Sequence, residues 1–413
     1  DSVASRGLGD VYKRQVDEYA CLYIADGNSG RTAEPMKRII KHFALVVLFF
    51  AAIGTVVSAE MVDPSVEIER YLAGEEIKRI QENIPSQAAE MMENRGISSF
   101  TDLISMPAED LWHLLLDEFK GSVQEPLRVL VSLLGAVLLC AVVKGIGSSM
   151  GGGVHRVFSV IMTAFAVSLL IRPVIKCILS LYTVFADFSL FLTVYIPIFA
   201  GIMTTAGQPM TGALYNVLLF GACQGINGLL QAAFVPIISC YLSLSIITEI
   251  VPQMGMRDLV LGFKKVIIWG LGVTMTVFVA LLSLQSAIAG GGDNVTVKAT
   301  KFMLSSLIPG VGSSLSELFM ATQGCIQLVK STVGAAGIVI AALTFLPIVV
   351  RVALWQAVST GGSAIADMLG IGELSRLLKS VGSALSIMLA IALYYAMLFI
   401  VSTSLMILAF KGG

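Results

Sequence analysis

The side chains that most often carry out catalysis are few in this sequence and lie far apart. Its three histidines are His42, His113 and His155, and no two of them are neighbours. The sequence has no zinc-hydrolase motif, no phosphate-binding P-loop and no nucleophile elbow. Only the acids Asp187 and Glu249 fall within clearly apolar segments, and they are distant along the chain. We therefore predict that the protein is not an enzyme, with no catalytic, cofactor-binding or metal-binding residues.

A row of amide side chains is the stronger chemical signal. At about 100° per residue in a helix, the four amides of the apolar segment 210–231 fall on one face: Asn216, Gln224, Asn227 and Gln231. Amides in hydrocarbon need hydrogen-bond partners, so we expect this face to point into a helical bundle. Two roles stay open, namely hydrogen bonding between helices and the polar lining of a transport path or binding site.

The stretch 193–209, just before this segment, combines an apolar composition with residues that interrupt helices. Proline removes a backbone donor and glycine loosens the helix. Within lipid, such a break persists only where protein or a water-filled cavity satisfies the backbone. We predict an interrupted membrane element at the centre of a bundle, and a helix that is merely kinked is the alternative. The residues assigned to this path or gate are Pro197, Gly201, Thr204, Thr205 and Gln208.

A second interrupted element is expected in the weakly apolar segment 301–330. Leu307-Ile308-Pro309 there repeats the pattern Tyr195-Ile196-Pro197, and each motif leads into a turn of small residues. Transporter folds often bind substrate where two broken helices meet. We therefore add Pro309, Gly310 and Glu317 to the candidate path, although the match is too short to establish a duplication.

Charged residues inside the membrane tend to be functional or paired. Asp187 is the clearest intramembrane charge, and the bases Lys176 and Arg172 precede it, nearer the end of the helix. Glu317 is expected to have Lys330 close by. Structural ion pairs and functional sites both remain open for these acids.

The composition places the chain in the membrane class. Hydrophobic residues make up 56% of the 413 residues and charged residues 13%, against about 25% charged in a typical soluble domain. We predict an all-α, polytopic helical membrane protein with about 7–9 membrane segments, two of them broken by proline and glycine. The clear spans are 129–143, 157–171, 174–201, 210–231, 232–251, 266–289, 333–355 and 384–410.

The N-terminal part divides into three stretches before the membrane domain at 126–413. Residues 1–35 resemble translated adapter and upstream sequence, so we expect them to be non-native; a native tail is the alternative. Residues 36–59 have the basic start, apolar centre and small residues of a signal peptide, or of an uncleaved anchor. Residues 60–125 form an acidic head, in which one helix should end before Pro85 and another begin after Pro107.

The charge distribution predicts how the chain crosses the membrane. Residues 60–125 hold fifteen acids and five bases, whereas residues 126–413 hold seven acids and fifteen bases. Because cytoplasmic loops are rich in lysine and arginine, we place the head outside the cytoplasm. The Lys144–Arg156 and Arg257–Lys265 loops then lie inside. The side on which the C-terminus lies stays open, and Lys411 mildly favours the cytoplasm.

Three blocks of sequence resemble one protein family. They are YIPIFAGIMTTAGQPMTGALYN at 195–216, FKKVIIWGLGVTMTVFVALLSLQS at 263–286 and TVKATKFMLSSLIPGVGSSLSE at 296–317. In this order and spacing they are similar to the stage III sporulation protein AE family of endospore-forming bacteria. The resemblance runs from Met36 through the membrane domain and does not include residues 1–35.

The resemblance implies a role in sporulation after engulfment. Family members are expected in the mother-cell membrane around the forespore, in a secretion-like complex needed for forespore development and late forespore gene expression. The expected partners are the lipid bilayer, the ring-forming and ATPase subunits of the same operon, and a forespore-side channel protein, with no nucleic acid. No cofactor and no catalytic residues are implied. A gate or channel subunit is our first hypothesis; a structural platform and a stand-alone small-solute transporter are the alternatives.

Overall fold

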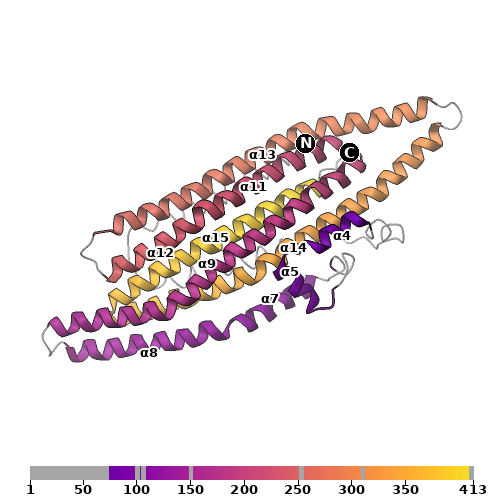
Figure 1. Ribbon diagram of the computed structural model, residues 1–413. Helices are drawn as coiled ribbons and strands as arrows, with labels where there is room; N and C mark the ends of the chain where they lie inside the picture. Colours follow the sequence, from indigo (N-terminus) through magenta and orange to yellow (C-terminus); the bar gives the residue numbers. More distant parts are fainter. Residues whose placement is uncertain are drawn as a thin grey trace.

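The computed structural model describes residues 74–97, 103, 108–147, 152–250, 255–307 and 312–408. Within these ranges every regular element is helical, and six helices are long and apolar enough to cross a membrane (Figure 1). The predicted all-α polytopic membrane class is therefore confirmed. The expected non-native stretch 1–35 and signal peptide 36–59 lie outside the described residues.

Long antiparallel helices form an elongated bundle (Figure 1). The chain passes up and down its length, and α13 and α8 lie at opposite edges of the bundle in this view. The helices are α8 (Gln124–Gly147), α9 (Gly152–Thr205), α10 (Pro209–Leu214), η2 (Tyr215–Leu219), α11 (Phe220–Leu229), η3 (Leu230–Phe234), α12 (Val235–Ile250), α13 (Arg257–Leu307), α14 (Gly312–Met368) and α15 (Gly372–Leu408).

Two pairs of predicted spans are continuous in the structure. The spans 157–171 and 174–201 both belong to α9, which passes through Pro173 and Pro197 without ending. The spans 210–231 and 232–251 form one helical run from Pro209 to Ile250 that contains the two π-helical turns η2 and η3. A proline removes one helical hydrogen bond, and packing against neighbouring helices keeps the rest of the helix intact. This fusion explains why six long helices replace the expected 7–9 segments.

An aromatic cluster fills the centre of the bundle, where α9, α14 and α15 meet. The Phe188 ring lies edge-on to Phe345 at 5.0 Å and to Phe399 at 5.4 Å between ring centroids. Phe185 and Tyr395 pack in the same way at 5.3 Å. These side chains are fully buried, and aromatic pairs in this geometry add to the free energy gained by burial. The interior of the described bundle is therefore packed with side chains at this level.

Glycines on α14 let its neighbours approach closely. A Cβ atom at Gly337 would clash with the Tyr195 ring of α9, and one at Gly334 would clash with Ile407 of α15. Tyr195 also donates a hydrogen bond to the Val333 carbonyl at 3.2 Å. Helix α14 is consequently buried along most of its membrane segment, whereas α13 lies at the periphery.

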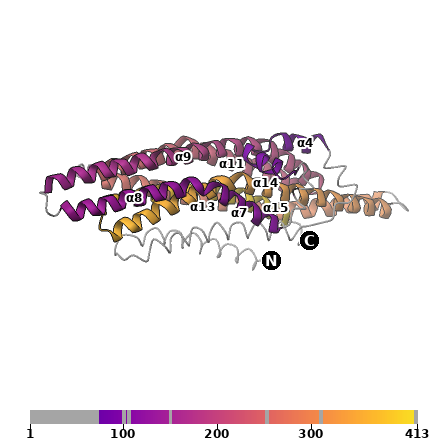
Figure 2. The same ribbon diagram turned by 90° about the horizontal axis from the view of Figure 1, so that it is seen from below.

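The head consists of short helices that pack on the bundle (Figure 2). Helix α7 (Ala108–Ser122) begins after Pro107 as predicted, and Pro85 separates α4 (Glu75–Glu82) from α5 (Ser86–Glu93), a helix not anticipated from the sequence. Helix α4 contacts α9, while α5 and α7 contact α14. The head and the bundle share one core, because the buried residues Ile80 and Ala88 belong to the same hydrophobic cluster as the buried residues of the long helices.

Candidate functional site

The interruption predicted within 193–209 lies at residues 206–208. Helix α9 ends at Thr205 and α10 begins at Pro209, with a turn at Ala206 and Gly207 between them. Gly207 has a φ of 84°, a left-handed conformation that strains other residues. Pro209 occupies the first turn of α10, where a missing N–H has no consequence. The sequence thus determines where the helix breaks and how it restarts.

Asp293 of α13 holds the start of α10. Its carboxylate accepts hydrogen bonds from the backbone N–H groups of Met210 at 2.9 Å and Thr211 at 3.1 Å, and from the Thr211 hydroxyl. The Asp293 side chain is buried. Helix N-termini present unsatisfied N–H groups and positive dipole ends. The buried carboxylate satisfies these groups and joins α10 to α13.

Lys330 of α14 holds the other side of the same turn. Its ammonium group donates a hydrogen bond to the Gln208 Oε1 atom at 2.8 Å, and both side chains are almost fully buried. A buried charge is costly unless it is hydrogen-bonded. An acid of α13 and a base of α14 therefore fix one turn between two helices.

Gln323 completes what we call the turn cluster, defined as Gly207, Gln208, Thr211, Asp293, Gln323 and Lys330. The Gln323 amide nitrogen lies against Gly207, in the space that a Cβ atom would occupy. Gln323 is buried, and within the described residues its Nε2 atom has no hydrogen-bond partner. An unsatisfied buried donor is destabilising. We therefore expect the Gln323 side chain to be held less tightly than Asp293 and Lys330.

Most residues predicted for the first broken element lie outside this cluster. Pro197 and Gly201 are exposed on α9, which stays helical there. The Thr204 hydroxyl donates to the Ala200 carbonyl at 2.9 Å, and Thr205 likewise bonds to its own helix. Of that predicted set, the structure brings only Gln208 into the cluster.

The predicted amide row does not form one continuous lining. Gln224 links α11 to α9, donating to the Thr193 hydroxyl at 3.0 Å and accepting from Ser189 at 3.1 Å. Gln231 donates to Asn227 at 3.1 Å, one turn away on the same helical run. Asn227 is buried and Asn216 is half-buried. All four amides are buried or half-buried in a run that contains the π-helical turns η2 and η3, and Gln224 serves as a bond between helices.

The segment 301–330 of the second predicted element contacts the first through Gln323 and Lys330, which lie against Gly207 and Gln208. Pro309 and Gly310 lie outside the described residues, as does the side chain of Glu317. Helix α13 continues to Leu307, about 14 residues or about 20 Å beyond Asp293. Glu317 and Lys330 are about 20 Å apart along α14. The prediction that Lys330 lies close to Glu317 is therefore wrong.

Asp187 has a different partner from those expected. Its carboxylate accepts a hydrogen bond from the Ser86 hydroxyl of α5 at 2.7 Å. Lys176 lies 3.6 Å from Glu125 of α8 instead. Asp187 is thus a contact between the head and the bundle, a role that its position in the sequence did not suggest.

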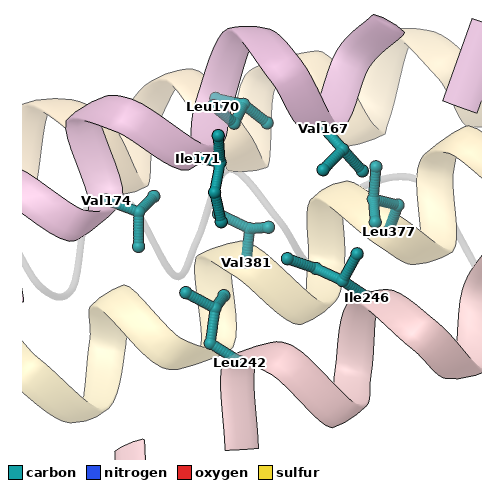
Figure 3. Close-up of a pocket in the computed structure, with 8 residues that line it drawn as sticks. All are labelled: Val167, Leu170, Ile171, Val174, Leu242, Ile246, Leu377 and Val381. Carbon is teal, nitrogen blue, oxygen red and sulfur yellow. The ribbon is translucent and has the colours of Figure 1, made fainter. Parts of the chain in front are cut away.

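A small cavity lies between α9, α12 and α15 (Figure 3). It is lined by apolar side chains that include Leu170 and Val174, Leu242 and Ile246, and Leu377. Its volume of about 10 Å³ is room for about one water molecule. We interpret it as a packing defect, and the turn cluster remains the better candidate for a functional site.

The helical bundle and the turn cluster together define the class of protein. It is a polytopic α-helical membrane protein with buried charges at a break between two helices. The sequence profile of the stage III sporulation protein AE family matches residues 94–409. The chain therefore belongs to this family of sporulation proteins, and the resemblance seen in the sequence is confirmed.

A curated relative supports the assignment. The chain is 25% identical over 150 residues to stage III sporulation protein AE of Bacillus subtilis (strain 168). The match covers 36% of this chain and spans only 38% of the relative. No solved structure shows significant similarity.

Proposed function

We propose that this chain is the membrane subunit of a sporulation channel complex linking mother cell and forespore, located in the mother-cell membrane around the forespore. Family membership supports the sporulation role, and the long apolar helices support a place in the membrane. In this proposal the α9–α10 turn acts as a gate element. The ring-forming and ATPase subunits of the same operon and a forespore-side channel protein are its partners.

The observation that carries the gate role is the pair of buried opposite charges at the turn. Asp293 and Lys330 come from different helices; Lys330 bonds to Gln208, and Asp293 bonds to Met210 and Thr211 of the same short segment. A short segment held by a few polar bonds can switch between two discrete arrangements. A close-packed apolar core does not deform continuously, so we look for the moving element at the turn. Since aromatic side chains fill the bundle between α9, α14 and α15, we place the gate at the turn cluster between α10, α13 and α14.

The test replaces both members of the Lys330–Gln208 pair. Lys330→Met with Gln208→Leu removes a buried charge together with one acceptor, so that neither side chain of this pair is left unsatisfied by loss of the other. We expect normal membrane levels and normal copurification of partner proteins, with heat-resistant spores reduced at least a hundredfold. The matched control is Thr276→Val, because Thr276 is exposed and its hydroxyl bonds only to its own helix.

Normal spore counts in the double variant would refute the gate role. Loss of partner copurification would favour the second candidate, a structural platform. The observation that favours a platform is the row of exposed acids on the docked head, which includes Glu76, Glu82, Glu90 and Glu93. Charge reversal at Glu76 and Glu82 would then abolish partner binding while leaving the membrane domain folded.

A further inference from the structure

Four basic side chains lie together midway along the bundle, on the face formed by α8, α9 and α14. We call them the basic belt, which consists of Arg128, Arg172, Lys176 and Arg351, all of them exposed. Lys176 of α9 lies 3.6 Å from Glu125 at the start of α8. Arg351 of α14 donates a hydrogen bond at 3.4 Å to Ser180, which is one turn of α9 from Lys176. These contacts bring three helices together at one level of the bundle.

The antiparallel packing of α8 and α9 adds Arg128 and Arg172 to this patch. Because Glu125 contacts Lys176, one further turn along each helix, in opposite chain directions, brings Arg128 to the level of Arg172. The patch then holds four bases and one acid. Among the described residues, Lys176 is the only one of the four bases that forms an ion pair. A net positive charge therefore remains for an anion from outside the protein.

A second level of charged positions lies near the end of the bundle where α8 ends and α9 begins, and where α14 ends and α15 begins (Figure 1). On each of the three helices, 16 positions separate the belt from this level, at Lys144 on α8, Arg156 on α9 and Asp367 on α14. No charged residue lies between the two levels on any of these helices. Sixteen helical residues span about 24 Å, and the hydrocarbon core of a bilayer about 30 Å. Since long basic side chains extend towards water, the two levels match the two surfaces of one bilayer.

The surface of this face changes in character at the belt. Between the two levels it is apolar: Val131 and Leu138 of α8 are 68% and 57% exposed, and Ile161 of α9 is 57% exposed. Beyond the belt it carries the head, because the Ser86–Asp187 hydrogen bond attaches α5 to α9. Asp187 is 11 positions from Lys176, or about 16 Å. The belt thus lies between a surface suited to lipid tails and a polar domain, which is the level of the lipid head groups.

We propose that the basic belt binds the phosphate groups of anionic lipids, in the leaflet on the side of the head. Basic residues at a membrane surface attract anionic lipids, and guanidinium groups match the geometry of phosphate oxygens. Because Glu125 pairs with Lys176, the three arginines are the groups that contact phosphate. Bound lipid would fix the depth of the bundle and hold the head over the membrane. The proposal concerns the surface of α8, α9 and α14 and stands whether or not the α9–α10 turn is a gate.

The first test measures lipid binding to the full-length chain in detergent by native mass spectrometry. Phosphatidylglycerol and phosphatidylcholine with the same acyl chains are compared, and we expect the anionic lipid to bind at least tenfold more tightly. The belt variant Arg128→Gln/Arg172→Gln/Arg351→Gln should lose this preference, whereas Arg351→Lys alone should keep most of it. The matched control removes the same charge from exposed bases of the head, in Lys78→Gln/Arg79→Gln/Lys120→Gln. It should bind both lipids as the unaltered chain does.

Three results of this test would overturn the proposal. The first is equal affinity of the unaltered chain for the two lipids. The second is an equal loss of the preference in the head control, which would indicate a general effect of charge. The third is displacement of the lipid by inorganic phosphate at the same concentration, which would indicate a site for a soluble anion. Circular dichroism separates lost binding from lost fold, because all the altered side chains are exposed.

The second test locates the edge of the lipid in nanodiscs that contain phosphatidylglycerol. Leu138→Cys lies between the two charged levels, and Leu190→Cys lies about 21 Å beyond Lys176 on the side of the head. Both leucines are exposed in the bundle. A water-soluble maleimide should label the Leu190→Cys variant and not the Leu138→Cys variant, above the background that the native cysteines give in the unaltered chain. Equal labelling of the two variants would place the edge of the lipid away from the belt and overturn the proposal.

Discussion

Lys330 and Asp293 show how single charged residues can be accommodated in a predominantly apolar protein. Each is buried, and each is hydrogen-bonded to a short segment that a helix break makes available. The break frees backbone N–H groups for Asp293, and the Gln208 side chain supplies an acceptor for Lys330. Removing either charged group alone would leave its partners unsatisfied, at a cost of about 1–3 kcal/mol.

Gly207 provides a direct test of the turn at residue level. We expect Gly207→Ala to reduce the free energy of unfolding by about 1–2 kcal/mol, because an L-residue is strained at this positive φ. The Gln323 amide can move away from the added methyl group, but the backbone strain remains. Thermal unfolding in detergent measures the effect.

Gly221→Ala is the control for that measurement. Gly221 lies in α11, is exposed, and has open space where a Cβ atom would be. Alanine is favoured over glycine inside a helix by about 1 kcal/mol, so this variant should be as stable as the unaltered chain or more stable. Equal behaviour of the two alanine variants would contradict the account of the turn.

The sequence predicted part of the turn cluster. A break was expected within 193–209, with Gln208 among its residues, because glycine and proline act locally on the backbone. Asp293 was not singled out and Lys330 was assigned to Glu317, since their role in the turn depends on contacts between residues 83 and 122 positions apart. The signal available in the sequence was that each of these charges stands alone beside an apolar segment. A single sequence does not show which residue such a charge contacts.

At the scale of elements, the sequence correctly predicted that the apolar segments are helices. It did not predict that two neighbouring segments would join into one continuous helix. Pro173 follows Arg172, a combination that resembles a helix end, yet α9 continues through both. Pro197 is exposed, and α9 continues through it as well. The true end at Thr205 requires the left-handed conformation of Gly207, a stronger interruption than the loss of one hydrogen bond.

The aromatic cluster should dominate the packing of α9, α14 and α15. Phe188→Ala is expected to lower the free energy of unfolding by about 3–5 kcal/mol, the cost of a large cavity in a packed core. Phe188→Leu should cost less, because it retains most of the side chain. Tyr182→Ala on the same helix is the control, since Tyr182 is exposed. Chemical denaturation that gave equal losses at 188 and 182 would contradict this assignment.

At the scale of the whole molecule, the head and the membrane bundle share one core. Ser86 and Asp187 are 101 positions apart and joined by a hydrogen bond. We expect Ser86→Cys with Asp187→Cys to form a disulfide in the folded protein, seen as a mobility shift without reductant. Glu93→Cys with Asp187→Cys is the control, because Glu93 lies about two turns further along α5. A disulfide in the control pair alone would mean that the head docks elsewhere.

The measurement that tests the gate role most directly is a reversible lock of the α9–α10 turn. Thr211→Cys with Asp293→Cys places two thiols where a hydrogen bond joins α10 to α13. The account predicts that oxidation stops solute passage through the assembled complex, that reductant restores it, and that Thr211→Cys alone is insensitive to oxidant. Undiminished passage with the disulfide fully formed would contradict the claim that this turn moves.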